Sequence, residues 1–177
     1  MNSHTQNESK NEHEAKEAQP FDNDLDYLQT ELSWIDIRCR RICAQKRLAL
    51  VEDDDEPTPF SVRRNHEQNS PKVLLARGER ARQREDRLRD KIDARLEAHR
   101  RSDRPALAID VLCDRCGLDN FHRQILLLSV APCFSQRFEE LYGRITGFDL
   151  AEALSVEAAY TFCELSFSER IDRRKDF

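Results

Sequence analysis

The spacing of apolar residues near the start of the chain is the feature that most constrains its fold. They recur alternately three and four positions apart, as Leu25, Leu28, Leu32, Ile35, Cys39 and Ile42. This spacing places them on one face of an α-helix, which we expect over residues 22–51, with Asp22 or Asp24 capping its start. Trp34 and Ile37 widen the apolar face, so we expect this helix to be covered on more than one side.

A second long helix is predicted over residues 72–104. Its apolar positions form a thin stripe, and alternating Arg, Asp and Glu cover the other faces. A stripe this narrow needs a partner, and the helix over 22–51 offers a matching one, so we expect an antiparallel hairpin. Self-association through Leu88, Ile92 and Leu96 is the alternative.

The flanking segments differ in composition from the two helices. Residues 1–21 are rich in Asn, Glu, Lys and His and are predicted to be a disordered polar tail. Residues 52–71 carry an acidic run and three prolines, so we expect a linker. Residues 105–177 contain more apolar side chains and are predicted to form a compact bundle. We expect 22–177 to be one domain.

Helix boundaries in the bundle are marked by capping and stop residues. Pro105 suits the first turn of a helix, Gly117 a left-handed stop, and Asp119 the cap of the next helix. Ser166 and Glu169 have the spacing of a capping box, in which each side chain satisfies a backbone donor of the same turn. These signals predict several short helices joined by tight connections.

The helix predicted over 121–131 differs from the others because Ile125–Leu128 leaves no polar face. A helix that is apolar all round is expected at the centre of a bundle, and Pro132 is expected to end it. With only four glycines in 177 residues, an all-β fold is disfavoured. The sequence therefore predicts an all-α protein in which a long N-terminal hairpin packs on a compact multi-helix bundle.

The glycines also bear on catalysis. None of them belongs to a phosphate loop, and no pair has the G-x-G spacing of a dinucleotide site. They are Gly78, Gly117, Gly143 and Gly147. No local set of histidine, carboxylate and nucleophile can be assembled either. We therefore expect no enzyme activity, no catalytic residue and no cofactor in this chain.

Net charge and hydropathy bear on the partners of the chain and on its location in the cell. Its net charge of −5 does not match nucleic acid. Residues 1–23 contain no apolar run of the kind that a secretory signal needs. The longest apolar stretch, 125–131, is far shorter than a membrane span. We expect a soluble cytoplasmic protein whose cysteines are reduced.

Cys113 and Cys116 have the spacing of a zinc or redox pair. A structural zinc needs four ligands, and the other close pair, Cys39 and Cys43, falls on a different helix. No βαβ pattern surrounds the pair, which argues against a thioredoxin-like site. Free cysteine packs like a small apolar residue, so we expect a role in the core and no metal site.

Two other groups of residues invite functional interpretations. Residues 77–104 hold eleven Lys or Arg and seven Asp or Glu, without an aromatic residue for base stacking. Because the acids are interleaved, a solvated helix face is favoured over nucleic-acid binding. Glu152 and Glu157 are expected on the surface. The aromatic residues predicted for the core are Trp34, Phe121, Phe134, Phe138, Tyr142 and Phe148.

Three segments in order carry a resemblance to a known family. They are LCDRCGLDNFHRQILLLSVAP over Leu112–Pro132, RFEELYGRI over Arg137–Ile145, and LSVEAAY followed by SFSER over 154–170. They resemble the N-terminal region of large bacterial AAA-family ATPases that also carry a winged-helix domain. Members of that group are found with contractile, phage-tail-like injection particles. The resemblance extends to residues 25–42 but not to the tail or the linker.

The resemblance implies a non-catalytic role for this chain. The phosphate loop, acidic metal-holding strand and arginine finger of such ATPases lie downstream of the matching region, and so does their winged-helix domain. The last predicted helix, 166–177, has no stop signal, which favours a chain that continues. We therefore expect a protein-interaction or substrate-recruitment domain of an AAA-family ATPase, with protein partners. A stand-alone helical adaptor or regulator is the alternative, and nucleic-acid binding through the Arg-rich helix a weaker third.

Overall fold

The computed structural model describes residues 18–53, 71–147 and 154–176. Within these ranges all regular structure is helical, which confirms the expected all-α fold. The elements are α1 (Asp24–Asp53), α2 (Pro71–Arg101), α3 (Ala108–Cys116), α4 (Asn120–Phe134), α5 (Arg137–Thr146), α6 (Val156–Phe162), α7 (Phe167–Asp172) and the 3₁₀ helix η1 (Arg173–Asp176). No helix in the described ranges is both long and apolar enough to cross a membrane.

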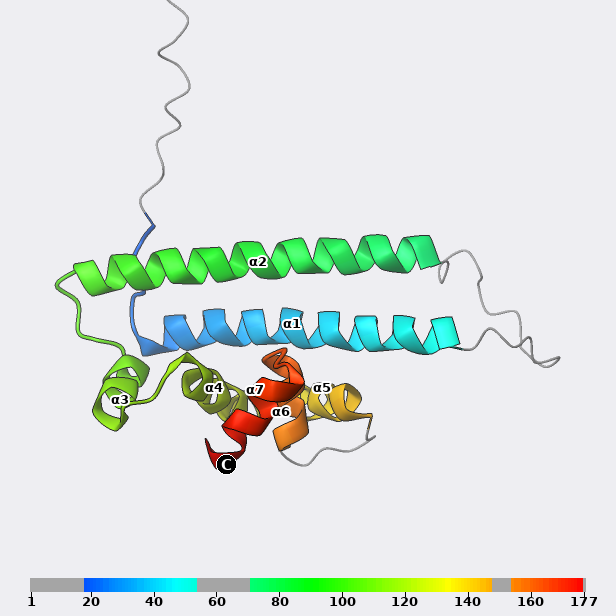
Figure 1. Cartoon of the computed structure of the whole chain (residues 1–177). Helices are drawn as coiled ribbons and strands as arrows, with labels where there is room; N and C mark the ends of the chain where they lie inside the picture. The colour runs from blue at the N-terminus through cyan, green and yellow to red at the C-terminus, as the bar shows by residue number, and fades with distance from the viewer. Residues whose placement is uncertain (1–17, 54–70, 148–153, 177) are drawn as a thin grey trace, which may run out of the picture.

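Helices α1 and α2 run antiparallel, side by side, and the shorter helices gather on the opposite side of α1 (Figure 1). Helix α1 contacts α2, α4, α5 and α6. The centre of the fold is therefore α1, and the expectation that α4 would be central is wrong. Helix α4 buries Leu127 and Leu128 but leaves Val130 41% exposed, because only one of its faces meets α1 and α5.

The apolar stripe of α2 is used inside the chain. Ile92 and Leu96 are buried in the common core, and Leu88 packs against it. On α1 the matching residues Ile35 and Ile42 are also buried. The stripe thus closes the hairpin, as the first of the two alternatives predicts, and is not available for pairing with a second copy.

The last residues of the predicted tail, 18–21, belong to the described structure, and Phe21 contradicts the expectation for this part of the tail. Phe21 is fully buried, with its ring edge-on to Tyr27 at 5.2 Å between centroids. The guanidinium of Arg95 lies over the same ring, 4.0 Å from its centroid. One aromatic side chain can bury enough apolar surface to order the few residues around it. The average composition of residues 1–21 is polar and does not show this contribution. Residues 1–17 lie outside the described residues.

Side chains from the end of α2 hold the backbone of this entry segment. The ring nitrogens of His99 lie 3.1 Å from the carbonyl oxygen of Phe21 and 2.9 Å from that of Pro105. Arg104 also donates to the Phe21 carbonyl. These bonds tie the entry into α1 and the connection from α2 to α3 to one end of the hairpin.

The start of α1 is capped by a residue that we did not predict. Asn23, rather than Asp22 or Asp24, accepts the backbone N–H of Asp26 at 3.0 Å. Asp24 instead accepts the backbone N–H of Ala108 at 2.7 Å. The carboxylate expected to cap its own helix therefore serves the first turn of α3, far away in sequence, and α3 begins three residues after Pro105 rather than at it.

The other boundary signals are confirmed. Gly117 ends α3 with a φ of 62°, in the left-handed region that favours glycine. The Asp119 carboxylate accepts the backbone N–H of His122 and caps α4. Ser166 and Glu169 form both bonds of the capping box at the start of α7. One glycine stop and two polar caps therefore predict these three boundaries correctly.

Pro132 does not end α4, which continues to Phe134. A proline inside a helix lacks the N–H that would bind the carbonyl four residues earlier, here that of Leu128. The buried hydroxyl of Tyr142 donates to this carbonyl at 2.8 Å. A tertiary hydrogen bond from α5 thus replaces the missing helical bond, and the last turn of α4 is retained.

This replacement predicts the effect of two substitutions. Tyr142→Phe should lower the free energy of unfolding by about 1–3 kcal/mol, because the buried Leu128 carbonyl loses its donor. Adding Pro132→Ala restores the helical N–H and should recover most of that loss. Urea denaturation of the two single variants and the double variant measures both effects, and additive losses in the double variant would contradict this explanation.

Candidate functional site

An ion-pair network fixes the hairpin to the C-terminal helices. The guanidinium of Arg41 binds the Glu85 carboxylate at 2.5 Å and that of Glu164 at 2.7 Å. Arg38 binds Glu85 at 2.6 Å and donates to the Phe162 carbonyl at 2.8 Å. Arg41 and Glu85 are both buried. Glu85 of α2, a charge that we expected in solvent, thus belongs to a network that joins α2, α1 and the segment after α6.

A second polar cluster lies closer to the start of the hairpin. Glu31 is buried on α1, where it accepts the Tyr27 hydroxyl at 2.8 Å and the guanidinium of Arg89. Burial and the Glu31 charge both raise the pKa of Tyr27, so its hydroxyl stays protonated and acts as a donor. Arg123 of α4 donates to the Tyr27 oxygen at 2.9 Å and to the Asp110 carboxylate.

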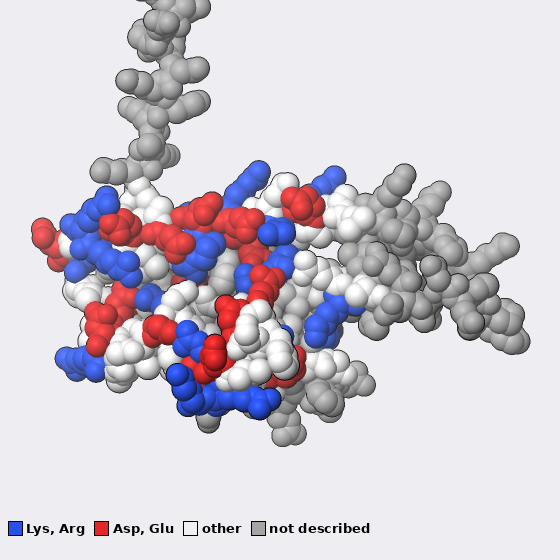
Figure 2. Space-filling model, in the orientation of Figure 1, with Lys and Arg blue, Asp and Glu red and all other residues white. Residues whose placement is uncertain are grey.

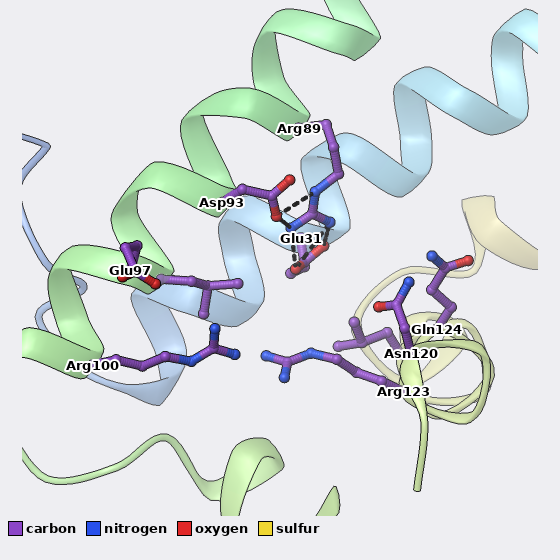
Figure 3. Close-up of a pocket in the computed structure, with 10 residues that line it drawn as sticks. Glu31, Arg89, Asp93, Glu97, Arg100, Asn120, Arg123 and Gln124 are labelled. Atoms are coloured by element: carbon purple, nitrogen blue, oxygen red, sulfur yellow. Dashed lines mark hydrogen bonds and ion pairs between the residues drawn. The ribbon is translucent and has the colours of Figure 1, made fainter.

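This cluster forms part of a cavity of about 380 Å³ between α1, α2 and α4 (Figure 3). The cavity is lined by Glu31, Arg89, Asp93, Leu96, Glu97, Arg100, Asn120, Arg123, Gln124 and Leu127. Arg100 and Arg123 point toward one another from opposite walls (Figure 3). Arg100 reaches to 4.0 Å from the Asp110 carboxylate that Arg123 also binds.

The chemistry of the cavity is that of paired charges. Arg89 binds both Glu31 and Asp93, and Arg101 binds Glu97. These carboxylates are engaged by guanidinium groups, so the cavity is suited to polar contacts.

The end of the cavity that carries Asn120 is positioned by the cap of α4. Burial raises the pKa of Asp119, but the His122 N–H and the Arg173 guanidinium at 2.7 Å outweigh it and lower this pKa to about 2. A folded-state pKa below the usual value of about 4 means that the charged cap contributes stability at neutral pH. That contribution is lost as the pH falls from about 4 through about 2.

Asp119→Ala should therefore lower the free energy of unfolding by about 1 kcal/mol at neutral pH, and by less in acid. Asp119→Asn is the control, because its amide oxygen can still cap the helix without titrating. Thermal melting over a pH series measures the three proteins. A gap between wild type and Asp119→Ala that stays constant down to the lowest pH would show that the charge does not stabilise the cap.

A second concavity, an apolar groove of about 290 Å³, lies between α1, α3 and α4. It is lined by Asp24, Tyr27, Leu28, Ala108, Ile109, Leu112, Leu126, Leu127 and Val130. Leu112 and Val130 are 45% and 41% exposed. Grouped apolar side chains left open to solvent beside a groove are typical of a protein-interaction site. We therefore take this groove as the candidate functional site.

The groove was not predicted, because Leu28 is expected on the apolar face of the first helix and residues 121–131 are expected in a buried central helix. Leu112 and Val130 fit the apolar pattern of their helices, and that pattern does not distinguish a residue facing the core from one facing a groove. Phe134, also predicted for the core, is 53% exposed at the end of α4. Trp34, Phe121, Phe138 and Tyr142 are buried as predicted. Phe148 and Glu152 lie outside the described residues.

The two cysteines of α3 differ in burial. Cys113 faces inward and is buried, whereas Cys116 is exposed in the last turn, so the expectation that both pack in the core is wrong for Cys116. Cys39 is buried in the core, and burial raises the pKa of its thiol. No group of three or more His, Cys, Asp or Glu among the described residues is placed to hold a metal ion.

The Arg-rich helix α2 presents mixed charge to solvent. Acidic and basic side chains alternate along it in Figure 2. Arg89 and Arg95 turn toward α1, where they bind Glu31 and Asp26. Two arginines of α2 thus serve the internal packing of the hairpin. Glu157 is exposed, as expected, and pairs with Arg170 at 3.0 Å.

Comparison with known proteins gives one family. Residues 9–177 match the family described as "Winged helix domain, variant". Neither the curated proteins nor the solved structures gave a match. The sequence resemblance placed a winged-helix domain downstream of this chain, whereas the family match covers the chain itself. Because the match spans nearly the whole sequence, the chain belongs to the winged helix domain, variant, family.

Proposed function

We propose that this chain is a non-catalytic protein-interaction domain of an AAA-family ATPase that works with contractile injection particles. The single observation that carries the interaction role is the open apolar groove between α1, α3 and α4. The link to the ATPase rests on the resemblance of the three ordered sequence segments. Within such an ATPase the domain would recruit a particle component or cargo, and the motor would lie in another part of the protein.

The groove and the resemblance involve the same stretch of chain. The most extended of the resembling segments, Leu112–Pro132, forms the end of α3 and nearly all of α4. It supplies the exposed side chains of Leu112 and Val130 and the groove residues Leu126 and Leu127. The pattern shared with the resembling ATPases thus supplies part of an exposed groove. This supports a shared binding partner, whereas a pattern confined to the core would support only a shared fold.

The lining of the groove indicates the kind of group it would bind. Asp24 is the one charged residue among those that line it, and one of its oxygens is engaged by the backbone of Ala108. Apolar side chains of a protein segment fit such a lining, as when an amphipathic helix lies in a groove. Nucleotides and other highly charged ligands do not fit it, because their desolvation would not be compensated.

The proposal is tested by capture from extracts of the source cells. The immobilised wild-type domain is expected to retain components of the injection particle, identified by mass spectrometry. Val130→Asp should abolish this retention, because it puts a charge in the groove wall without touching the core. Leu75→Asp is the matched control, since Leu75 is exposed on α2, which contributes no residue to the groove.

Equal recovery of particle components by Val130→Asp and wild type would overturn the role of the groove. Recovery of other proteins with no particle component would favour the stand-alone adaptor. Circular dichroism of each variant must first show the helical content of wild type. The domain is also expected to show no saturable binding of Mg-ATP in calorimetry, and such binding would contradict a non-catalytic role.

A further inference from the structure

Helix α7 carries an apolar face that no other described element covers. Phe167 is 79% exposed, and Ile171, one turn later on the same side, is 48% exposed. Together the two side chains form a small exposed apolar patch, of the kind that a second molecule can cover. We call Phe167 and Ile171 the α7 face.

The α7 face is held away from the groove of its own chain. Arg170 binds Glu157 of α6 at 3.0 Å, and Arg173 binds Asp119 at the start of α4 at 2.7 Å. The guanidinium of Arg173 also lies over the Phe121 ring, 4.7 Å from its centroid. These contacts attach the C-terminal half of α7 and the start of η1 to α6 and α4, while Phe167 and Ile171 stay exposed to solvent.

The charges next to the two surfaces are complementary. Residues 166–177 hold four Arg or Lys and three Asp or Glu. Arg170 and Arg173 are paired with Glu157 and Asp119, so the complementary charges are those of Arg174 and Lys175. Figure 2 shows a basic group at the edge of the molecule where α7 and η1 lie. Arg174 and Lys175 are exposed and follow Ile171 by one turn. The groove is apolar like the α7 face, and its one charged lining residue is the acidic Asp24.

We propose that the α7 face of one copy of this chain docks in the α1/α3/α4 groove of a second copy. Phe167 and Ile171 would cover the exposed apolar side chains of Leu112 and Val130. Arg174 or Lys175 would lie next to Asp24. The contact joins two different surfaces, so each copy offers one α7 face and one groove. Two copies can therefore associate, and further copies can add in the same sense.

This inference rests on the proposed function only in treating the groove as a protein-binding surface. A second copy in the groove would have to leave before an injection-particle component could bind there. Self-association would thus regulate access to the site, and adding the recruited protein would dissociate the copies. The two ideas fail separately, since a monomeric domain could still capture a particle component.

The experiment is sedimentation velocity over a concentration series, with charges placed in each surface. Wild type should show a weight-average mass that rises with concentration from 20.8 kDa to twice that value and beyond. Phe167→Asp and Leu112→Asp should each remain monomeric, because each puts a charge in the apolar contact. Both substituted side chains are exposed, so circular dichroism is expected to show the helical content of wild type. Leu75→Asp, on the outer part of α2, should associate like wild type.

Mixing the two monomeric variants gives the decisive result. Phe167→Asp keeps an intact groove and Leu112→Asp keeps an intact α7 face, so an equimolar mixture should regain one contact and form heterodimers. A protein that carries both substitutions should not associate with itself. Wild type that stays monomeric throughout the series, or a mixture of the two variants that stays monomeric, would overturn the proposal.

Discussion

Replacing Glu85 with alanine is expected to lower the free energy of unfolding by about 3–5 kcal/mol. Glu85 is buried and binds both Arg38 and Arg41. Without it, Arg41 remains buried, with Glu164 as its remaining carboxylate partner. A buried guanidinium that has lost most of its compensating charge is destabilising because it cannot regain its hydration.

The matched control is Glu97→Ala on the same helix. Glu97 pairs with Arg101 on the surface, where both side chains are more than half exposed. An exposed pair of this kind contributes only about 0–1 kcal/mol. Chemical denaturation of the two variants compares them directly. Equal losses in both would show that the Glu85 network is not a buried tie between the hairpin and the bundle.

Replacing Phe21 with alanine is expected to cost about 3–5 kcal/mol, the range for removing a buried aromatic ring. Phe21 is fully buried and contacts both Tyr27 and Arg95, so its loss leaves a cavity beneath the entry segment. The carbonyl contacts from His99 and Arg104 would weaken with it. Thermal and chemical denaturation measure the loss of stability.

Phe167→Ala is the control, because it removes the same ring from an exposed site. Its effect should lie within about 0.5 kcal/mol of zero, as for most surface substitutions. Hydrogen exchange adds a local measurement, since Phe21→Ala should speed exchange most in the first turns of α1. A Phe21→Ala protein as stable as wild type would show that the entry segment does not belong to the core.

The long hairpin could be predicted because its signal is local and repeated. Alternating spacings of three and four mark α1, and the thin stripe on α2 needs a partner of the same length. The stops and caps at Gly117, Asp119 and Ser166 could also be predicted, since each depends on a bond within one helical turn. These features require no knowledge of what lies across the fold.

The features that the sequence did not reveal depend on contacts between distant residues. Glu85 and Glu164 meet Arg41 from 44 and 123 positions away, and nothing in the charge pattern of α2 selects Glu85 from its acidic neighbours. Tyr142 lies on α5, and its hydroxyl donates to the Leu128 carbonyl and so stabilises the last turn of α4. The sequence therefore predicts a helix end at Pro132, because the donor that replaces the missing N–H lies on a different helix.

The candidate site could not be predicted for a related reason. Periodicity identifies Leu112 and Val130 as apolar positions but does not say whether a neighbouring helix covers them. Here the first turns of α1 and α3 lie beside the middle of α4, and Leu112 and Val130 stay 45% and 41% exposed between them. The groove therefore depends on how three helices are placed in space, which their separate patterns do not encode.

The mass of the native protein in the source cell tests the central claim most directly. An antibody raised against this domain should detect a chain several times larger than 20.8 kDa. Mass spectrometry of that band should find the phosphate loop of an AAA-family ATPase, and injection-particle components should co-purify with it. A single band near 20.8 kDa, with no ATPase sequence, would contradict the account and identify a free-standing helical adaptor.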